Sequence, residues 1–174
     1  MKKILLLVPL VLVLALVGCK KVDELLTFTV DVSQSVTIPG FFGPGAQLPP
    51  VSVITKSDES FRNNKTTRDK VKNVLLDQLV LTVTSPAGNT FDFLEKIDLY
   101  INTPNTNNKI LLAYLHVIPQ GVNTIKLVPT TAKLDEYLKA ETYELTVDTK
   151  LTTSRSNSFV VRSDSKFKVT ADPL

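Results

Sequence analysis

Apolar and polar residues alternate along most of this chain, with the period of two that is typical of half-buried β-strands. The clearest runs lie at residues 26–32, 79–84, 97–101 and 143–147, with shorter ones at 51–53, 123–128, 158–162 and 166–170. Val36 and Ile38 are expected to continue the first run after a bulge or kink. Because successive side chains of a strand point to opposite faces, this pattern predicts sheets with one buried face.

The segments between these runs predict turns and little helix. "PGFFGPGAQLPP", residues 39–50, is too rich in Gly and Pro for a regular element. "KILLAYLHVIP", residues 109–119, is apolar on both faces and predicts a central strand. Residues 57–73 fit either a helix or a surface excursion, and residues 133–139 fit a helical turn or two. We therefore expect an all-β fold, an antiparallel immunoglobulin-like β-sandwich of about seven to nine strands with one or two short helical turns.

The N-terminus has the shape of a signal peptide. Lys2 and Lys3 precede residues 4–17, which are all apolar and are interrupted only by Pro9. A membrane-spanning helix needs about 20 apolar residues. This run is shorter, so we favour a cleaved signal over an uncleaved anchor.

Leu16-Val17-Gly18-Cys19 resembles the lipobox of bacterial lipoproteins. The resemblance implies cleavage by signal peptidase II between Gly18 and Cys19, with lipid attached to Cys19. Residues 1–18 would then be the signal peptide, 19–25 a lipidated tether and 26–174 the β-sandwich domain. Two or three acyl chains hold a protein on a membrane far more firmly than one. The alternative is that Cys19, the only cysteine of the chain, is an ordinary buried residue.

The residues after Cys19 bear on the destination of such a lipoprotein. Lys20 is not the Asp that retains enteric lipoproteins at the inner membrane, so the resemblance implies the outer membrane. Residues 21–24, Lys-Val-Asp-Glu, loosely resemble the surface-export tag of some gram-negative lipoproteins. Whether the domain faces the periplasm or the cell surface stays open.

A second resemblance covers residues 134–147, "LDEYLKAETYELTV". They are similar to the turn before the last strands of fibronectin type III and other immunoglobulin-like domains. That likeness implies a tyrosine corner, in which the hydroxyl of Tyr143 donates to upstream backbone. It supports the fold class and implies no activity.

The sequence contains none of the common catalytic motifs, such as G-x-S-x-G, H-E-x-x-H or a phosphate-binding loop. His116 is the only histidine, and a hydrolase would need a nucleophile brought to it from elsewhere in the fold. We interpret His116 as a packed or edge residue. The aspartates are scattered, as at positions 23, 31, 148 and 164, so no metal site and no cofactor is expected.

Three surfaces are candidates for contact with a partner. Phe41 and Phe42 lie between glycines in the Gly/Pro-rich loop, where they would form a contact site or plug an open end of the sandwich. The tyrosines could line a sugar- or peptide-binding surface, although packing is the simpler interpretation. A basic run could touch anionic lipid, although nearby acids favour a solvated face. The tyrosines are Tyr100, Tyr114, Tyr137 and Tyr143, and the basic run is Arg62, Lys65, Arg68, Lys70 and Lys72.

The charge balance gives no case for a nucleic-acid partner, because without Lys2 and Lys3 the chain has 18 basic and 17 acidic residues. We expect a lipid-anchored outer-membrane lipoprotein with a non-catalytic binding or structural role and an envelope protein or glycan as partner. One alternative is a lipid- or hydrophobe-binding module with a cavity between the sheets, lined by residues 110–118. A hydrolase that uses His116 is the second alternative.

Overall fold

Eight antiparallel strands form most of the part of the chain that the structure describes, and the all-β prediction is confirmed. The computed structural model describes residues 26–40, 50–55, 57–154 and 156–172. The strands are β1 (Thr27–Ile38), β2 (Val51–Ile54), β3 (Val71–Ser85), β4 (Leu94–Asn102), β5 (Ile110–Leu115), β6 (Thr124–Pro129), β7 (Thr142–Leu151) and β8 (Phe159–Ala171). Three short helical segments accompany them, α2 (Ser57–Asn63), the 3-10 helix η1 (Arg68–Lys70) and α3 (Asp135–Lys139).

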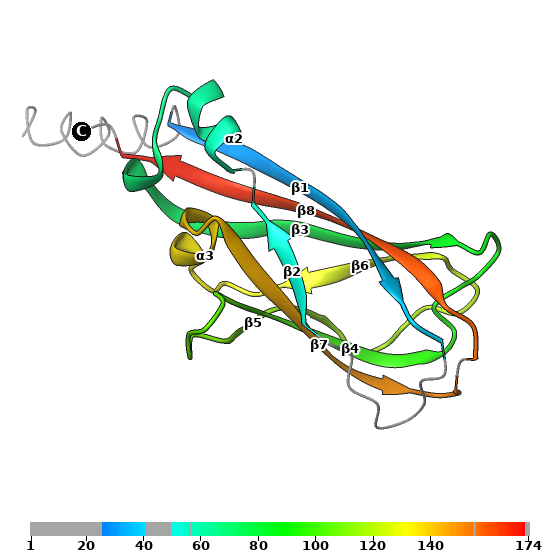
Figure 1. Ribbon diagram of the computed structural model, residues 1–174. Coiled ribbons are helices and arrows are strands. Elements are labelled where there is room, and N and C mark those ends of the chain that lie inside the picture. The colour runs from blue at the N-terminus through cyan, green and yellow to red at the C-terminus, as the bar shows by residue number, and fades with distance from the viewer. Residues whose placement is uncertain (1–25, 41–49, 56, 155, 173–174) are drawn as a thin grey trace, which may run out of the picture.

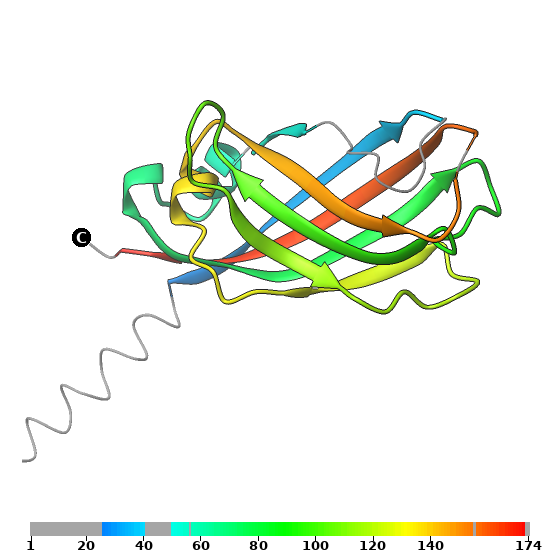
Figure 2. The ribbon, with the colours of Figure 1, turned by 90° about the horizontal axis from the view of Figure 1, so that it is seen from below.

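The strands belong to one continuous sheet in the order β1-β8-β3-β6-β5-β4-β7-β2. The sheet curls until its two halves face each other, with β1, β8, β3 and β6 on one side (Figures 1 and 2). Only two residue pairs, Ala113 with Pro129 and Tyr114 with Val128, join the halves through β5 and β6. An immunoglobulin-like sandwich has two separate sheets. Here the same layering arises from a single curled sheet whose ends are β1 and β2.

Long strands replace some of the shorter runs expected from the sequence. β1 pairs with β8 from Thr27 to Ile38 without a change of register, so the predicted bulge before Val36 is wrong. The runs at 158–162 and 166–170 are parts of one strand, β8. Inward-facing Ser163 and Ser165 interrupt the apolar alternation between these runs, but backbone pairing to β1 and β3 continues through them.

One end of the curled sheet, which we call the closed end, is covered by α2, η1 and α3, and β1 begins and β8 ends there (Figure 1). Phe61 of α2 is 1% exposed and its ring meets Phe28 edge-on at 6.2 Å. Ser57 Oγ donates to the carbonyl of Leu138 at 2.9 Å. α3 is tied to β3, since the backbone NH of Leu134 donates to the carbonyl of Val74 at 2.9 Å. The short helices therefore act as packing elements that fill this end.

The tyrosine that bonds to upstream backbone differs from the one expected. Tyr137 of α3 donates its hydroxyl to the carbonyl of Asn108 at 2.5 Å. Tyr143 instead packs edge-on against Phe167, with ring centroids 6.5 Å apart, and burial raises the pKa of its hydroxyl. Among the described residues no hydrogen bond of the Tyr143 hydroxyl is found, so the tyrosine corner at this position is wrong. The anchoring role falls to Tyr137 because α3 points that ring toward the loop before β5.

Candidate functional site

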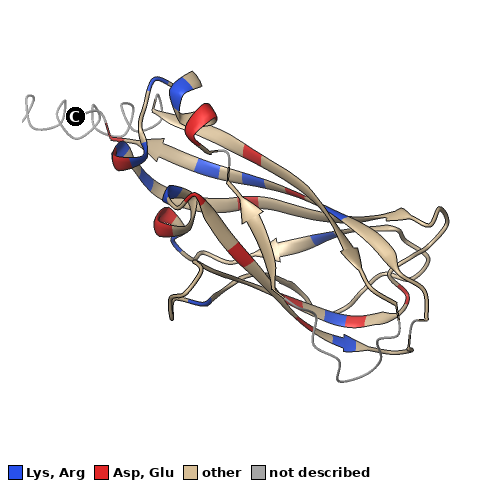
Figure 3. Ribbon diagram, viewed as in Figure 1, with Lys and Arg blue, Asp and Glu red and all other residues tan. Residues whose placement is uncertain are grey.

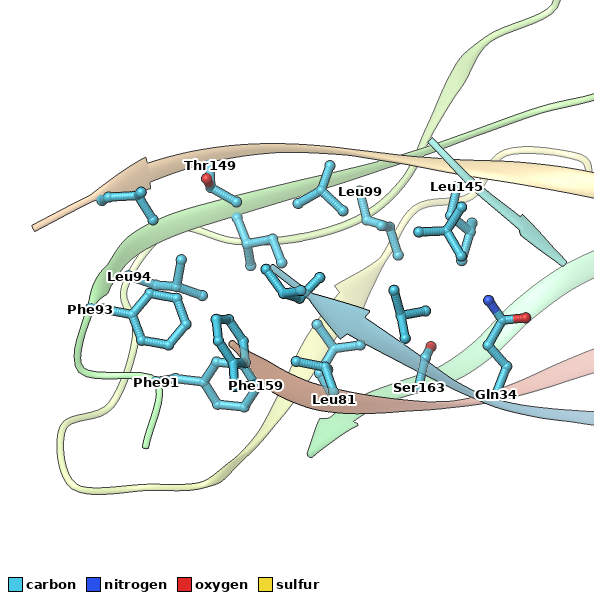
Figure 4. A pocket seen from close by; sticks show the side chains of 17 residues that line it. Gln34, Leu81, Phe91, Phe93, Leu94, Leu99, Leu145, Thr149, Phe159 and Ser163 are labelled. Carbon is cyan, nitrogen blue, oxygen red and sulfur yellow. The ribbon is translucent and has the colours of Figure 1, made fainter. Parts of the chain in front are cut away.

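The two halves of the curled sheet enclose an apolar cavity of about 90 Å³ (Figure 4). Three aromatic rings, Phe91, Phe93 and Phe159, lie at one side of it, and Phe93 meets Phe159 edge-on at 5.0 Å. None of the described side chains that line it is charged. The lining residues are Gln34, Val36, Ile38, Val51, Leu81, Phe91, Phe93, Leu94, Ile97, Leu99, Leu145, Val147, Thr149, Leu151, Phe159, Val161 and Ser163.

Three polar side chains interrupt this apolar lining. Gln34 of β1 and Ser163 of β8 are partners in the strand register, so both occupy inward positions of the sheet. Thr149 reaches the cavity from β7, in the opposite half (Figure 4). A polar group in apolar surroundings raises the free energy of the fold unless it is hydrogen-bonded. Among the described residues, only Thr66 has a fully buried polar side-chain atom without a partner, so the polar atoms of Gln34, Ser163 and Thr149 remain accessible to water or to a ligand.

The cavity lies beside the seam where the curled sheet is not closed by hydrogen bonds. β1 and β2 are the two ends of the sheet, and β2 covers β7 only from Thr142 to Leu145. The remainder of β7, from Thr146 to Leu151, has β4 as its only strand neighbour among the described strands. Val36 and Ile38 border the seam from β1, while Val147 and Leu151 border it from β7.

A polar cluster occupies the outer surface of β4 and the end of β5. His116 Nε2 lies 2.8 Å from Asp98 Oδ1, and Lys96 Nζ lies 3.1 Å from Asp98 Oδ2. The Tyr114 ring stacks beside the His116 ring with centroids 4.8 Å apart. Burial by itself would raise the pKa of Asp98, but the hydrogen bonds from His116 and Lys96 lower it overall. The cluster thus holds Asp98 as a carboxylate between two donors.

This cluster shows what His116 can do chemically. Its side chain is 58% exposed, and a carboxylate partner of the kind that orients a catalytic histidine is present in Asp98. The hydrogen bond in which it takes part joins it to Asp98, and no hydroxyl or thiol among the described residues is found bonded to it. For the hydrolase alternative, Asp98 could act as the group that orients His116, but no nucleophile among the described residues is bonded to His116.

The other residues singled out in the sequence are found in different settings. Gly18, Cys19, Phe41 and Phe42 lie outside the described residues. Tyr100 and Tyr114 are partly exposed, whereas Tyr137 and Tyr143 are buried in the core. The tyrosines consequently do not form one binding surface.

The cavity is lined by strands other than the one expected. None of its described lining residues belongs to 110–118, because β5 lies in the middle of the sheet order and the cavity lies beside the free edges of β1 and β7. The sequence did contain a signal for it. Gln34 and Ser163 place polar side chains where the alternation of their strands calls for apolar ones.

The basic run is divided among partners. Arg68 donates from Nε and Nη2 to the carboxylate of Asp58, and its Nη1 donates to the carbonyl of Lys139 at 3.0 Å. Nζ of Lys72 lies 3.7 Å from Oδ1 of Asp172. Acidic and basic residues are interspersed along the ribbon at this end of the molecule (Figure 3). The geometry is that of a mixed, solvated face.

The described residues contain neither a candidate metal site nor a candidate membrane span. No group of three or more His, Cys, Asp or Glu side chains in those parts of the chain is arranged to hold a metal ion. No helix within the described ranges is long and apolar enough to cross a membrane.

Comparison with known proteins identifies no family. No protein-family model matches the chain, and no curated protein matches it. Solved structures with a similar course include the decameric BFDV capsid protein, at 5% identity and a TM-score of 0.36, covering 82% of this chain and 99% of that one. A structure of turnip yellow mosaic virus is 11% identical with a TM-score of 0.28, and the match covers 84% of this chain and 94% of that one. The Drosophila NLP core is 10% identical with a TM-score of 0.23, and the match covers 80% of this chain and 96% of that one. Such low scores carry no argument about function.

Proposed function

We propose that this protein is a lipid-anchored lipoprotein of the bacterial outer membrane whose β domain has a non-catalytic binding or structural role. The observation that carries the proposal is the lipobox-like Leu16-Val17-Gly18-Cys19 that follows an apolar run and stands directly before the domain. β1 begins at Thr27, so in a chain anchored at Cys19 residues 20–26 form the tether. At roughly 3.3 Å each, these residues keep the start of β1 within about 25 Å of the membrane.

The position of β1 in the fold indicates which end of the domain would face the membrane. Thr27 lies at the closed end, beside the helices and the C-terminal end of β8 (Figure 2). A short tether therefore brings the closed end toward the membrane. The opposite end, where β1 ends and β8 begins, is directed away from it and is available to a partner such as an envelope protein or a glycan.

The non-catalytic part of the proposal is supported by the setting of His116. Its hydrogen bond to Asp98 and its stacking against Tyr114 give the ring a structural role on the sheet surface. A hydrolase site would require a nucleophile in contact with His116 and a pocket around it. An unchanged cellular phenotype of His116→Ala is the expected result.

The anchor is tested by Cys19→Ser in cells given a radiolabelled fatty acid. The variant is expected to accumulate as an uncleaved precursor without label, whereas the matched change Val22→Ser is expected to be processed and labelled normally. Protease treatment of intact cells then assigns the membrane face, and crosslinking identifies the partner. Normal cleavage and labelling of Cys19→Ser would contradict the proposal.

A further inference from the structure

We propose that the cavity between the two halves of the sheet binds the apolar end of a small, uncharged amphiphile, whose polar group meets Gln34 and Ser163. This inference deepens the proposed binding role, and it names the chemistry of one ligand. The cavity supplies an apolar wall of three phenylalanine rings and several aliphatic side chains. Apolar sites with a few convergent polar groups are the usual form of small-molecule sites in proteins.

The polar lining indicates that the ligand is more than a hydrocarbon. Gln34 and Ser163 are register partners that face inward from neighbouring strands, whereas Thr149 lines the cavity from β7, apart from them and nearer to Phe93 and Leu94 (Figure 4). Within the described residues, neither Gln34 nor Ser163 is found in a side-chain hydrogen bond with another protein group. A hydroxyl or amide of a ligand would supply both donors and acceptors to these two side chains. Gln34 and Ser163 therefore form the polar pole of the site.

The lining also excludes a charged head group from the cavity. All of its described side chains are uncharged, so an ionised carboxylate or ammonium would lose its hydration without gaining an opposite charge. A neutral alcohol or amide avoids this loss. The ligand class is thus narrower than lipids in general and leaves out fatty acids in their ionised form.

The volume limits how much of the ligand enters. The cavity measures about 90 Å³, whereas an engineered cavity of about 150 Å³ holds benzene and typical ligand pockets have about 300–1,000 Å³. Only a short alkyl segment or a branched chain end fits among Phe91, Phe93 and Phe159. The remainder of a longer ligand would leave through the seam between β1 and β7, where the described strands are not paired with each other.

The test uses cells that produce the full chain and a short alkyl diazirine probe that ends in a hydroxyl. After irradiation, the purified protein is expected to carry the probe on peptides that contain Phe91, Phe93 or Phe159. A matched probe that ends in a carboxylate is expected to label these peptides about tenfold less, which corresponds to the cost of burying its charge. Equal labelling by both probes would overturn the inference.

Two variants localise the binding. Val36→Phe fills the cavity and is expected to reduce labelling about tenfold, whereas Ser35→Phe, on the outward face of the same strand, leaves labelling unchanged. Gln34→Leu is expected to reduce labelling by the hydroxyl probe about two- to tenfold and to leave a probe without the hydroxyl unaffected. If Val36→Phe fails to fold, labelling of Gln34→Leu by the hydroxyl probe decides whether the ligand occupies the cavity. Wild-type labelling in Gln34→Leu, or in folded Val36→Phe, contradicts the proposed site.

The outcome is separable from the fate of the lipoprotein proposal. Absence of probe from the cavity peptides together with acylation of Cys19 overturns the ligand site and leaves the anchor. Labelled cavity peptides in a protein that is never acylated overturn the anchor and leave the ligand site.

Discussion

The closed end and the remainder of the seam between β1 and β7 cover the apolar interior in different ways. In both regions β1 and β7 are not paired with each other. At the closed end, α2 provides Phe61 and α3 provides Leu138 and Tyr137, each 1% exposed. Along the rest of the seam, Val36, Ile38 and Val147 remain only partly buried and border a cavity.

The difference shows how a single sheet can be both stable and open. A curled sheet with two free edges leaves polar backbone groups and apolar side chains at the seam, and covering them requires additional chain. This protein uses α2, η1 and α3 for one end. The other end keeps a space that a ligand can enter, so stability and binding are assigned to different parts of the same interior.

The largest expected effect is at the closed end. Phe61→Ala removes a fully buried ring that meets Phe28 and is expected to reduce the free energy of unfolding by about 3–5 kcal/mol. Equilibrium denaturation in urea measures it. A loss below about 1 kcal/mol would show that the helices do not close this end.

A matched pair on β1 compares the two ends directly. Val30 is 1% exposed, so Val30→Ala is expected to cost about 1.5–2.5 kcal/mol. Val36 is only partly buried and borders the cavity, where it already lacks neighbours on one side, so Val36→Ala is expected to cost less than about 1 kcal/mol. Equal losses in the same denaturation experiment would contradict the distinction between the ends.

Tyr137→Phe tests the hydrogen bond that fixes α3 at the closed end. Loss of the bond to the Asn108 carbonyl is expected to cost about 1 kcal/mol near neutral pH. Burial raises the pKa of Tyr137 to about 12, so its contribution to stability is complete below pH 10 and declines as the pH rises from 10 through 12. Alkaline denaturation of wild type should accordingly be steeper in this range than that of Tyr137→Phe. Parallel curves would show that Tyr137 titrates normally in the folded protein.

The smallest effect is expected at the Asp98 cluster, which lies away from the seam. The pKa of Asp98 is lowered in the folded state. The contribution of Asp98 to the free energy of unfolding is therefore present above pH 3.8, the ordinary carboxyl pKa, and is lost as the pH falls below that value. Asp98→Asn is expected to reduce the acid sensitivity of unfolding without altering labelling of the cavity. His116→Ala should have a similar but weaker effect. Altered probe labelling of the cavity peptides in either variant would show that the Asp98 cluster and the interior are coupled.

Local pattern was enough to locate most strands. The runs at 51–53, 97–101, 123–128 and 143–147 correspond to β2, β4, β6 and β7, and residues 133–139 contain α3. The first half of β3 was not predicted, because residues 71–73 were assigned to the basic segment and Asp77 and Gln78 interrupt the apolar pattern. Its pairing with β8 extends the strand through these positions, and that pairing joins segments about 90 residues apart.

The all-β class, the absence of familiar catalytic motifs and the lipobox resemblance at Cys19 could be read from the sequence, because each depends on residues that are close together in the chain. By contrast, the single curled sheet, the contact of Asp98 with His116 and the cavity lined by Gln34, Ser163 and Thr149 became apparent only in the folded molecule. These contacts bring together strands that are distant in sequence, and their geometry depends on which edges remain unpaired after the sheet has curled. Local alternation specifies which face of a strand is buried, whereas the space left beside that face depends on the whole sheet.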